Sequence, residues 1–182
     1  MGLDMYLISN SRKLCFTTRN PLEGVSKSLA ENGVIAYWRK ANSIHNWFVK
    51  HVQDGCDDCG YYIVTMQDLR DLNSDIDDVL ASSRLVMGKV SNGIVVAGQE
   101  RFDLRQRDGL VIDDTTVAER ILPTKNGFFF GGTDYDASYV QDLTYTKRVI
   151  EHIRSNVVVR GDAAHVIDEP DWNLKLFYHS SW

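Results

Sequence analysis

Apolar residues recur along the chain at two spacings, and each spacing predicts one kind of element. Alternating or short continuous apolar runs indicate β-strands. Such runs lie at 3–9, 34–38, 61–65, 128–130, 157–160 and 172–178. Apolar residues that are three and four positions apart indicate helices with one buried face. Such helices are expected at about 21–32, 42–52, 66–80 and 134–155.

Local signals mark where several of these helices begin and end. Asn20-Pro21 predicts the start of the first helix, because proline lacks an N–H group that the first turn leaves unpaired anyway. Asn32-Gly33 predicts its end. Thr65 is the expected N-cap of the third helix, and either Thr133 or Asp134 is that of the longest helix.

The segment from 84 to 113 is expected to form either strands or a helix with a loop, because apolar runs flank a charged middle at 100–108. Residues 116–122 predict a short helix or a connector. Strands and helices do not alternate in a regular β-α-β order, which favours an α+β fold over a doubly wound parallel sheet. We therefore expect a mixed or antiparallel sheet packed with several helices.

Length and composition indicate one domain. The chain has 182 residues, of which 43% are hydrophobic and 25% charged, enough to bury a core without metal or disulfide staples. No linker or repeat divides it, so residues 1–182 are expected to form a single globular α+β domain. The net charge of −5 does not suit a general nucleic-acid binder, although it leaves room for a local basic patch. It is compatible with a basic partner surface, but solubility is the simpler explanation and the one that the total charge favours.

Cysteine usage and the N-terminal sequence bear on the compartment. The three cysteines are too few, and odd in number, for a secreted disulfide framework. Residues 1–10 lack the basic and apolar stretches of a signal peptide. No apolar run approaches the ~20 residues of a membrane helix. We expect a cytoplasmic protein without a membrane partner, located in the host cell cytoplasm if a phage encodes it.

Cys56 and Cys59 form a C-x-x-C pair, a spacing typical of zinc or redox sites. No second pair of this kind exists, so His45 or His51 would have to complete a zinc site. Glycines flank the pair on both sides, which indicates a polar turn. The expectation is therefore that the chain holds no metal.

A strand, a tight turn and a helix start bring a group of polar and aromatic residues together. The group consists of Trp38, Arg39, Lys40, Asn42, His45 and Asn46. We expect the polar members to share one rim beside the backbone N–H groups of a helix N-terminus, which attract anions. Such a rim would hold a phosphate, a carboxylate or an acidic side chain of a partner. The alternative is that the tryptophan packs in the core and the two cations are only solvated.

The remaining motifs do not indicate catalysis. Asp134 and Asp136 fall at the start of the longest helix, where negative charge is favourable, so capping explains them without a metal. The chain contains no G-x-S-x-G, no G-x-x-x-x-G-K-[ST] and no G-x-G-x-x-G sequence. We therefore expect a binding protein without a cofactor rather than an enzyme.

Several segments resemble a family of small phage and bacterial proteins. These are the opening residues 1–7, the stretches 36–42 and 44–48, and residues 122–124 with 127–136. The chain also looks like a member of this family that acts as a type II-A anti-CRISPR protein. The resemblance implies a protein that binds a type II RNA-guided effector nuclease with its guide RNA and blocks target DNA recognition or cleavage.

Such nucleases expose basic channels, which an acidic surface can occupy. The acidic residues expected on this surface are Asp54, Asp57, Asp58, Asp71, Asp75 and Asp78. A solvated helix face is the alternative explanation for each of them. Two other hypotheses stay open. One is an enzyme or binder of a phosphate-bearing small molecule that uses the Arg39 and His45 cluster. The other is direct contact with DNA through Arg101, Arg105 and Arg107.

Overall fold

A four-stranded antiparallel sheet, in the order β2-β1-β8-β3, forms the centre of the molecule. Its strands are β1 (Asp4–Ser9), β2 (Val34–Arg39), β3 (Tyr61–Val64) and β8 (Leu176–Ser181). The computed structural model describes residues 2–11, 14, 25–97, 100–167 and 174–182. The first and last described strands pair in the middle of the sheet, and β2 and β3 are its edges. The expected α+β fold is confirmed.

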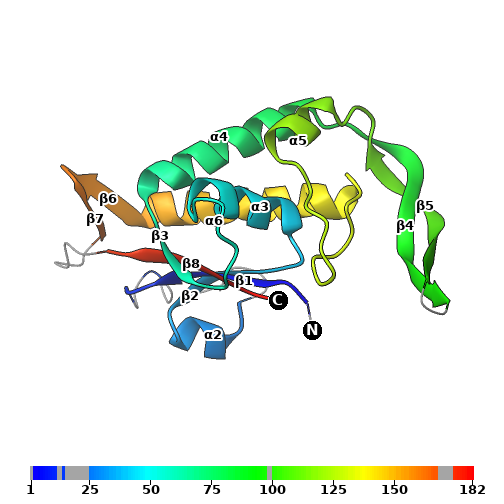
Figure 1. Ribbon diagram of the computed structural model, residues 1–182. Helices are drawn as coiled ribbons and strands as arrows, with labels where there is room; N and C mark the ends of the chain where they lie inside the picture. Colours follow the sequence, from blue (N-terminus) through cyan, green and yellow to red (C-terminus); the bar gives the residue numbers. More distant parts are fainter. Residues whose placement is uncertain (1, 12–13, 15–24, 98–99, 168–173) are drawn as a thin grey trace.

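Helices cover one face of this sheet (Figure 1). They are α3 (Asn42–His51), α4 (Met66–Ser82) and α6 (Ala137–Asn156), with the short α5 (Thr116–Ile121) beside α4. The short helix α2 (Lys27–Glu31) lies on the opposite side, against β2. Within the described ranges, no helix combines the length and the apolar character needed to cross a bilayer.

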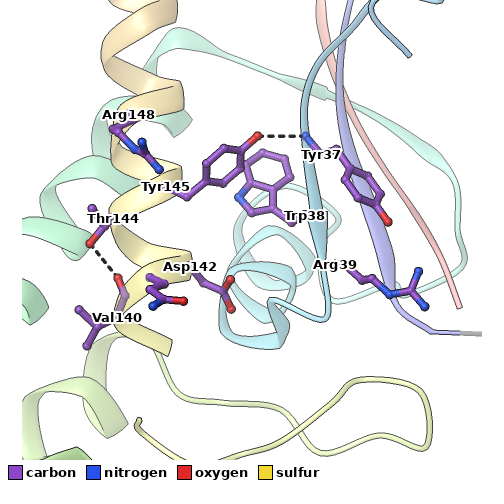
Figure 2. A pocket seen from close by; sticks show the side chains of 9 residues that line it. Tyr37, Trp38, Arg39, Val140, Asp142, Thr144, Tyr145 and Arg148 are labelled. Carbon is purple, nitrogen blue, oxygen red and sulfur yellow. Dashed lines mark hydrogen bonds between the residues drawn. The ribbon is translucent and has the colours of Figure 1, made fainter. Parts of the chain in front are cut away.

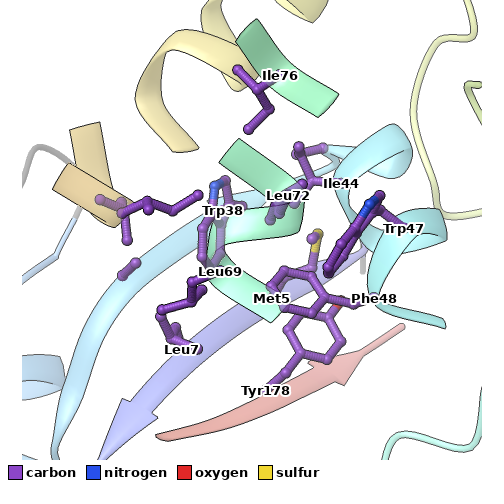
Figure 3. Close-up of a cluster of buried hydrophobic side chains, with 14 of the residues drawn as sticks. Met5, Leu7, Trp38, Ile44, Trp47, Phe48, Leu69, Leu72, Ile76 and Tyr178 are labelled. Atoms are coloured by element: carbon purple, nitrogen blue, oxygen red, sulfur yellow. The ribbon is translucent and has the colours of Figure 1, made fainter. Parts of the chain in front are cut away.

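The hydrophobic core lies between the sheet and these helices (Figure 3). Inward and outward residues alternate along β1, so Met5 and Leu7 are fully buried. The ring of Tyr178 on β8 stacks on Phe48 of α3, with 4.1 Å between ring centroids. The helical periodicity of α6 predicted its buried face, and all of the predicted residues are buried. They are Tyr139, Leu143, Thr146, Val149, Ile150 and Ile153.

Side-chain caps fix the starts of the two long helices. The Thr65 hydroxyl accepts the backbone N–H of Asp68, whose carboxylate accepts that of Thr65, so the predicted cap of α4 is confirmed. The N-cap of α6 is Asp136, later than predicted. Asp134 instead accepts the backbone N–H of Ser91 at 2.6 Å, which ties the start of α6 to β4.

Two predicted elements extend beyond the described residues. The helix start expected at Asn20-Pro21 lies outside them, and α2 begins after its N-cap Ser26. The helix ends before Gly33, as predicted, and the φ of 84° at this glycine disfavours other residues. The last strand was expected at 172–178, of which residues 172 and 173 are outside the description. The described strand β8 continues to Ser181.

The segment from 84 to 113 forms strands rather than a helix. β4 (Leu85–Ala97) and β5 (Glu100–Ile112) pair as a long antiparallel hairpin that projects from the body of the protein (Figure 1). A shorter hairpin, β6 (Val157–Arg160) with β7 (Ala163–Val166), follows α6.

The strand expected at 128–130 is wrong, because these residues form a turn. Phe130 is buried, whereas Phe128 is 78% exposed. The carbonyl of Phe129 accepts the backbone N–H of Leu3 at 2.9 Å, which holds the turn against the start of the chain. Three consecutive aromatic residues suggested a strand, but they belong to a loop that packs against α3.

Candidate functional site

The five polar residues expected to share a rim do not form one exposed anion site, and the alternative for Trp38, Arg39 and Lys40 describes the structure instead. Trp38 is buried in the core, and its indole N–H donates to Thr146 at 2.9 Å. Arg39 and Lys40 are exposed, with Lys40 in a left-handed turn at φ 64°. The start of α3 is buried, including Asn42, His45 and Asn46. Its backbone N–H groups therefore do not face solvent as an anion site would require.

Asn42 and Asn46 fasten α3 to the loop at 122–132. The amide of Asn42 donates to the carbonyls of Phe130 at 3.1 Å and Gly132 at 2.7 Å, and its oxygen accepts the backbone N–H of Lys125 at 3.0 Å. The amide of Asn46 donates to the carbonyl of residue 123 at 3.1 Å. These contacts engage both polar atoms of Asn42 and the amide nitrogen of Asn46 internally, so we assign both residues a structural role.

His45 lies at the centre of a buried hydrogen-bonded group. Its side chain is fully buried, with Nδ1 2.8 Å from the Tyr178 hydroxyl and Nε2 3.0 Å from Asp57 Oδ2. A carboxylate only accepts hydrogen bonds, so Nε2 carries the proton and Nδ1 accepts from Tyr178. Burial lowers the pKa of His45, although the neighbouring Asp57 opposes this shift. The ring is therefore neutral at pH 7. The predicted cluster of Arg39 with His45 does not form, because His45 bonds to Tyr178 and Asp57 whereas Arg39 bonds to Asp4.

Two of the six acidic residues expected on a surface are engaged in such internal contacts. Asp57 also accepts the indole N–H of Trp182 at 3.1 Å and lies 3.5 Å from the Lys125 ammonium. Asp75 accepts the indole N–H of Trp47 at 2.8 Å. The other four acidic residues are exposed. They are Asp54, Asp58, Asp71 and Asp78.

The C-x-x-C pair lies in a polar turn before β3. Cys56 is exposed and Cys59 is partly buried, and both are free thiols. Asp58 between them accepts the backbone N–H of Gly60 at 2.8 Å and the hydroxyl of Tyr62 at 3.0 Å. In the part of the chain that the structure describes, no three His, Cys, Asp or Glu side chains are grouped to hold a metal ion. The pair therefore has no described partners for a zinc site.

Residues of β2 and α6 do come together, around a cavity of about 560 Å³ (Figure 2). It brings Trp38 and Arg39 together with residues of α6 that the sequence analysis did not single out. The full lining is Tyr37, Trp38, Arg39, Val140, Gln141, Asp142, Thr144, Tyr145 and Arg148. α6 contacts β2, which is an edge strand of the sheet.

Asp142 is a carboxyl group in the lining of this cavity, and its pKa is raised. Burial, together with the nearby carboxylate of Asp136, raises the pKa of Asp142 to about 7. Figure 2 shows the side chain extending from α6 toward β2. A carboxyl group with this pKa is protonated in a large fraction of molecules at neutral pH, so it can donate as well as accept a hydrogen bond.

Two arginines also line the cavity. Arg39 contacts Asp4 at 3.2 Å through one guanidinium nitrogen, and 55% of its side chain is exposed. The Arg148 guanidinium lies 5.8 Å from the centre of the Tyr145 ring. The Tyr145 hydroxyl accepts the backbone N–H of Tyr37 at 3.4 Å, which connects α6 to the strand. Figure 2 shows the Arg39 side chain directed away from α6, so Arg148 is the arginine positioned to bind an anion in the cavity.

Helical spacing contained a signal for Asp142. The residue lies three positions after Tyr139 and four before Thr146, and both of these are buried. An acidic residue at such a position falls at the border of the buried face, where its pKa is expected to shift. The cavity itself needed the contact between β2 and α6, which lie about a hundred residues apart in the sequence.

The arginines expected to contact DNA lie on the projecting hairpin. Arg101, Arg105 and Arg107 are all in β5, and Arg107 is exposed, whereas the side chains of the other two are outside the described part. Lys89 on β4 pairs with Asp108 at 2.6 Å beside them. No family model, curated protein or solved structure matches this chain, so its function has to be argued from the geometry of its residues.

Proposed function

We propose that this chain is a binding protein and that the cavity between β2 and α6 holds a small phosphate- or carboxylate-bearing molecule. The observation that carries this proposal is that Arg148 and Asp142 of α6 line one cavity of about 560 Å³ together with Trp38 and Tyr145. Cavities of this size suit small ligands, and a few polar groups among aromatic walls give them specificity. Asp142 with its raised pKa is the kind of perturbed group that functional sites concentrate.

The proposed division of roles follows from the charges. The Arg148 guanidinium binds the anionic group of the ligand, since arginine matches phosphate and carboxylate oxygens with paired N–H donors. Asp142 donates a hydrogen bond when protonated and repels the anion when charged. Binding is therefore expected to strengthen as the pH falls through about 7, the pKa of this carboxyl group.

Thermal unfolding in the presence of inorganic phosphate, nucleoside monophosphates and small carboxylic acids tests this proposal. A ligand at a hundred times its Kd adds about 2.7 kcal/mol to the free energy of unfolding. Arg148→Gln is expected to abolish the response. Arg120→Gln on α5, which is also exposed, is the matched control and should preserve it. A panel without any response, or a response that survives Arg148→Gln, would exclude the cavity as an anion site.

The second candidate is the inhibitor of a type II effector nuclease that the resemblance implies. The exposed carboxylates of Asp54, Asp58, Asp71 and Asp78 favour it, because they suit the basic nucleic-acid channels of such an enzyme. The alternative explanation, a solvated face, also holds for any one of them. In this proposal, protein surface rather than the cavity makes the contact.

Co-purification with a panel of type II effectors carrying guide RNA, followed by a DNA cleavage assay, tests the second candidate. The double variant Asp71→Lys with Asp78→Lys should release the inhibition, while Glu119→Lys on α5 should not. Absence of a complex with any effector at micromolar concentration would remove this candidate. Arg148→Gln separates the two proposals, since it should affect ligand binding and leave nuclease inhibition unchanged.

A further inference from the structure

A row of aromatic rings crosses the sheet on the face away from α3, α4 and α6. Tyr37, Tyr6, His179 and Tyr61 occupy paired positions on the four neighbouring strands β2, β1, β8 and β3. Alternation along each strand places these residues on the face opposite the inward-pointing Met5, Trp38 and Tyr178. The aromatic row therefore lies on the side of the sheet away from the main hydrophobic core.

Three of the rings form a stack that ends at the edge of the sheet. Tyr6 and His179 are 5.8 Å apart with 20° between ring planes, and His179 and Tyr61 are 4.2 Å apart with 4°. Tyr61 is stacked on one side and is still 65% exposed. The other side of its ring therefore faces solvent.

The two halves of the row differ in how they are covered. Tyr6 and Tyr37 pack against Val25, Ala30 and Val34 in a small cluster with α2. At the other end, Ile63 lies two residues after Tyr61 on the edge strand and is 59% exposed. The open part of this face is thus the β8 and β3 half, where the stack ends.

We propose that this half of the sheet binds single-stranded nucleic acid, with one base stacked on the outer side of Tyr61. Another flat ring can extend a near-parallel ring stack. Every unpaired base has such a ring, whichever of the bases it is. A duplex hides the faces of its bases, so a single strand is required. β3 has only four residues, which is short for pairing with a strand from a second chain.

The charges near the stack indicate what kind of binding to expect. Lys175 is exposed just before β8. Arg39 is exposed at the end of β2, two residues after Tyr37 and opposite Asp4 of β1. Asp4 is already bonded to Arg39 and Tyr37, but Asp58 is exposed three residues before Tyr61. Because few cations lie near the stack among the residues that the structure describes, we expect base contacts rather than phosphate contacts to dominate. Affinity should therefore depend only weakly on salt.

Fluorescence anisotropy with labelled single strands of about ten nucleotides tests the proposal. Tyr61→Ala should weaken binding between about 5-fold and 100-fold, the range that corresponds to the loss of one stacked base. Tyr61→Phe keeps the ring and should bind within twofold of the unchanged protein. Phe128→Ala removes another exposed aromatic ring, 78% exposed, and is the matched control. Far-UV circular dichroism shows that each variant keeps its fold.

Three results would overturn the proposal. The first is no binding of DNA or RNA single strands at high micromolar protein. The second is binding that Tyr61→Ala leaves unchanged, or that a duplex of the same length reproduces. The third is a change in oligomeric state on Tyr61→Ala, measured by light scattering, which would assign this edge to a second copy of the chain. None of these results depends on the cavity between β2 and α6.

Discussion

Replacing Asp142 by asparagine should stabilise the protein at neutral and alkaline pH. The substitution keeps the shape of the side chain and its ability to form hydrogen bonds, and it removes the negative charge. Burial is the main reason that the pKa of Asp142 rises to about 7, so the folded protein resists the charged form of this carboxyl group. An amide in the same place does not meet that resistance.

The size of the effect follows from the difference between folded and unfolded protein. The pKa rises from 3.8 to about 7, and each unit corresponds to about 1.4 kcal/mol, which gives an upper value of about 4 kcal/mol. The side chain opens onto the cavity, where water lowers the penalty for the charge. We therefore expect Asp142→Asn to add roughly 2 kcal/mol to the free energy of unfolding at pH 8.

The pH dependence has a definite sign. Between pH 3.8 and about 7 the folded state holds the Asp142 proton more tightly than the unfolded state does. Rising pH through this window therefore lowers the stability of the unchanged protein relative to Asp142→Asn. Below the window both states are protonated and the difference between the two proteins should vanish. Above it the difference should be constant.

Urea unfolding of both proteins at a series of pH values measures this difference. Glu151→Gln, an exposed acid on the same helix, is the matched control and should change stability by less than about 0.5 kcal/mol at every pH. Comparing variants at each pH cancels the contribution of other groups, such as the buried His45. A difference that does not vary with pH, or a variant that is less stable at pH 8, would refute the reasoning.

Three further substitutions test the structural contacts by chemical denaturation. His45→Phe should lower the free energy of unfolding by about 2 kcal/mol, because it leaves the buried hydroxyl of Tyr178 without its hydrogen-bond partner and removes one partner of the partly buried Asp57 carboxylate. Thr65→Ala removes the hydroxyl that caps α4 and should lower it by about 1 kcal/mol. Gly131→Ala should lower it by about 2 kcal/mol, because φ is 91° and the added Cβ would lie 3.0 Å from that of Lys40. An unchanged denaturation midpoint in any of the three would contradict the contact concerned.

Features that depend on neighbouring residues were predictable from the sequence. The buried face of α6 follows from helical spacing, and the cap of α4 follows from Thr65, a residue type that favours the N-cap position. The antiparallel hairpin of β4 and β5 was less clear, because charged residues interrupt its apolar pattern. The spacing of apolar residues therefore identifies a helix or strand most clearly where one of its faces is buried and the other is exposed.

The candidate site could not be predicted in the same way. Polar residues at 38–46 suggested an anion rim, but Asn42 and Asn46 are used to hold a loop some eighty residues away. His45 meets Tyr178, which comes from the other end of the chain. Whether a polar side chain is available to a ligand depends on such distant partners, and these are set by the packing of the whole domain.

Both proposed binding sites lie at edges of the same sheet, and this has a consequence for experiments. An edge strand presents backbone N–H and C=O groups that no neighbouring strand uses, and a ligand can bind them directly. At β2 the Tyr145 hydroxyl takes up one such group, and the cavity lies beside it. At β3 the outer side of Tyr61 lies next to the free edge. Side-chain substitutions leave these backbone groups in place. A change at Tyr61 should therefore weaken its ligand without abolishing binding, and complete loss would indicate that the substitution has disturbed the edge strand itself.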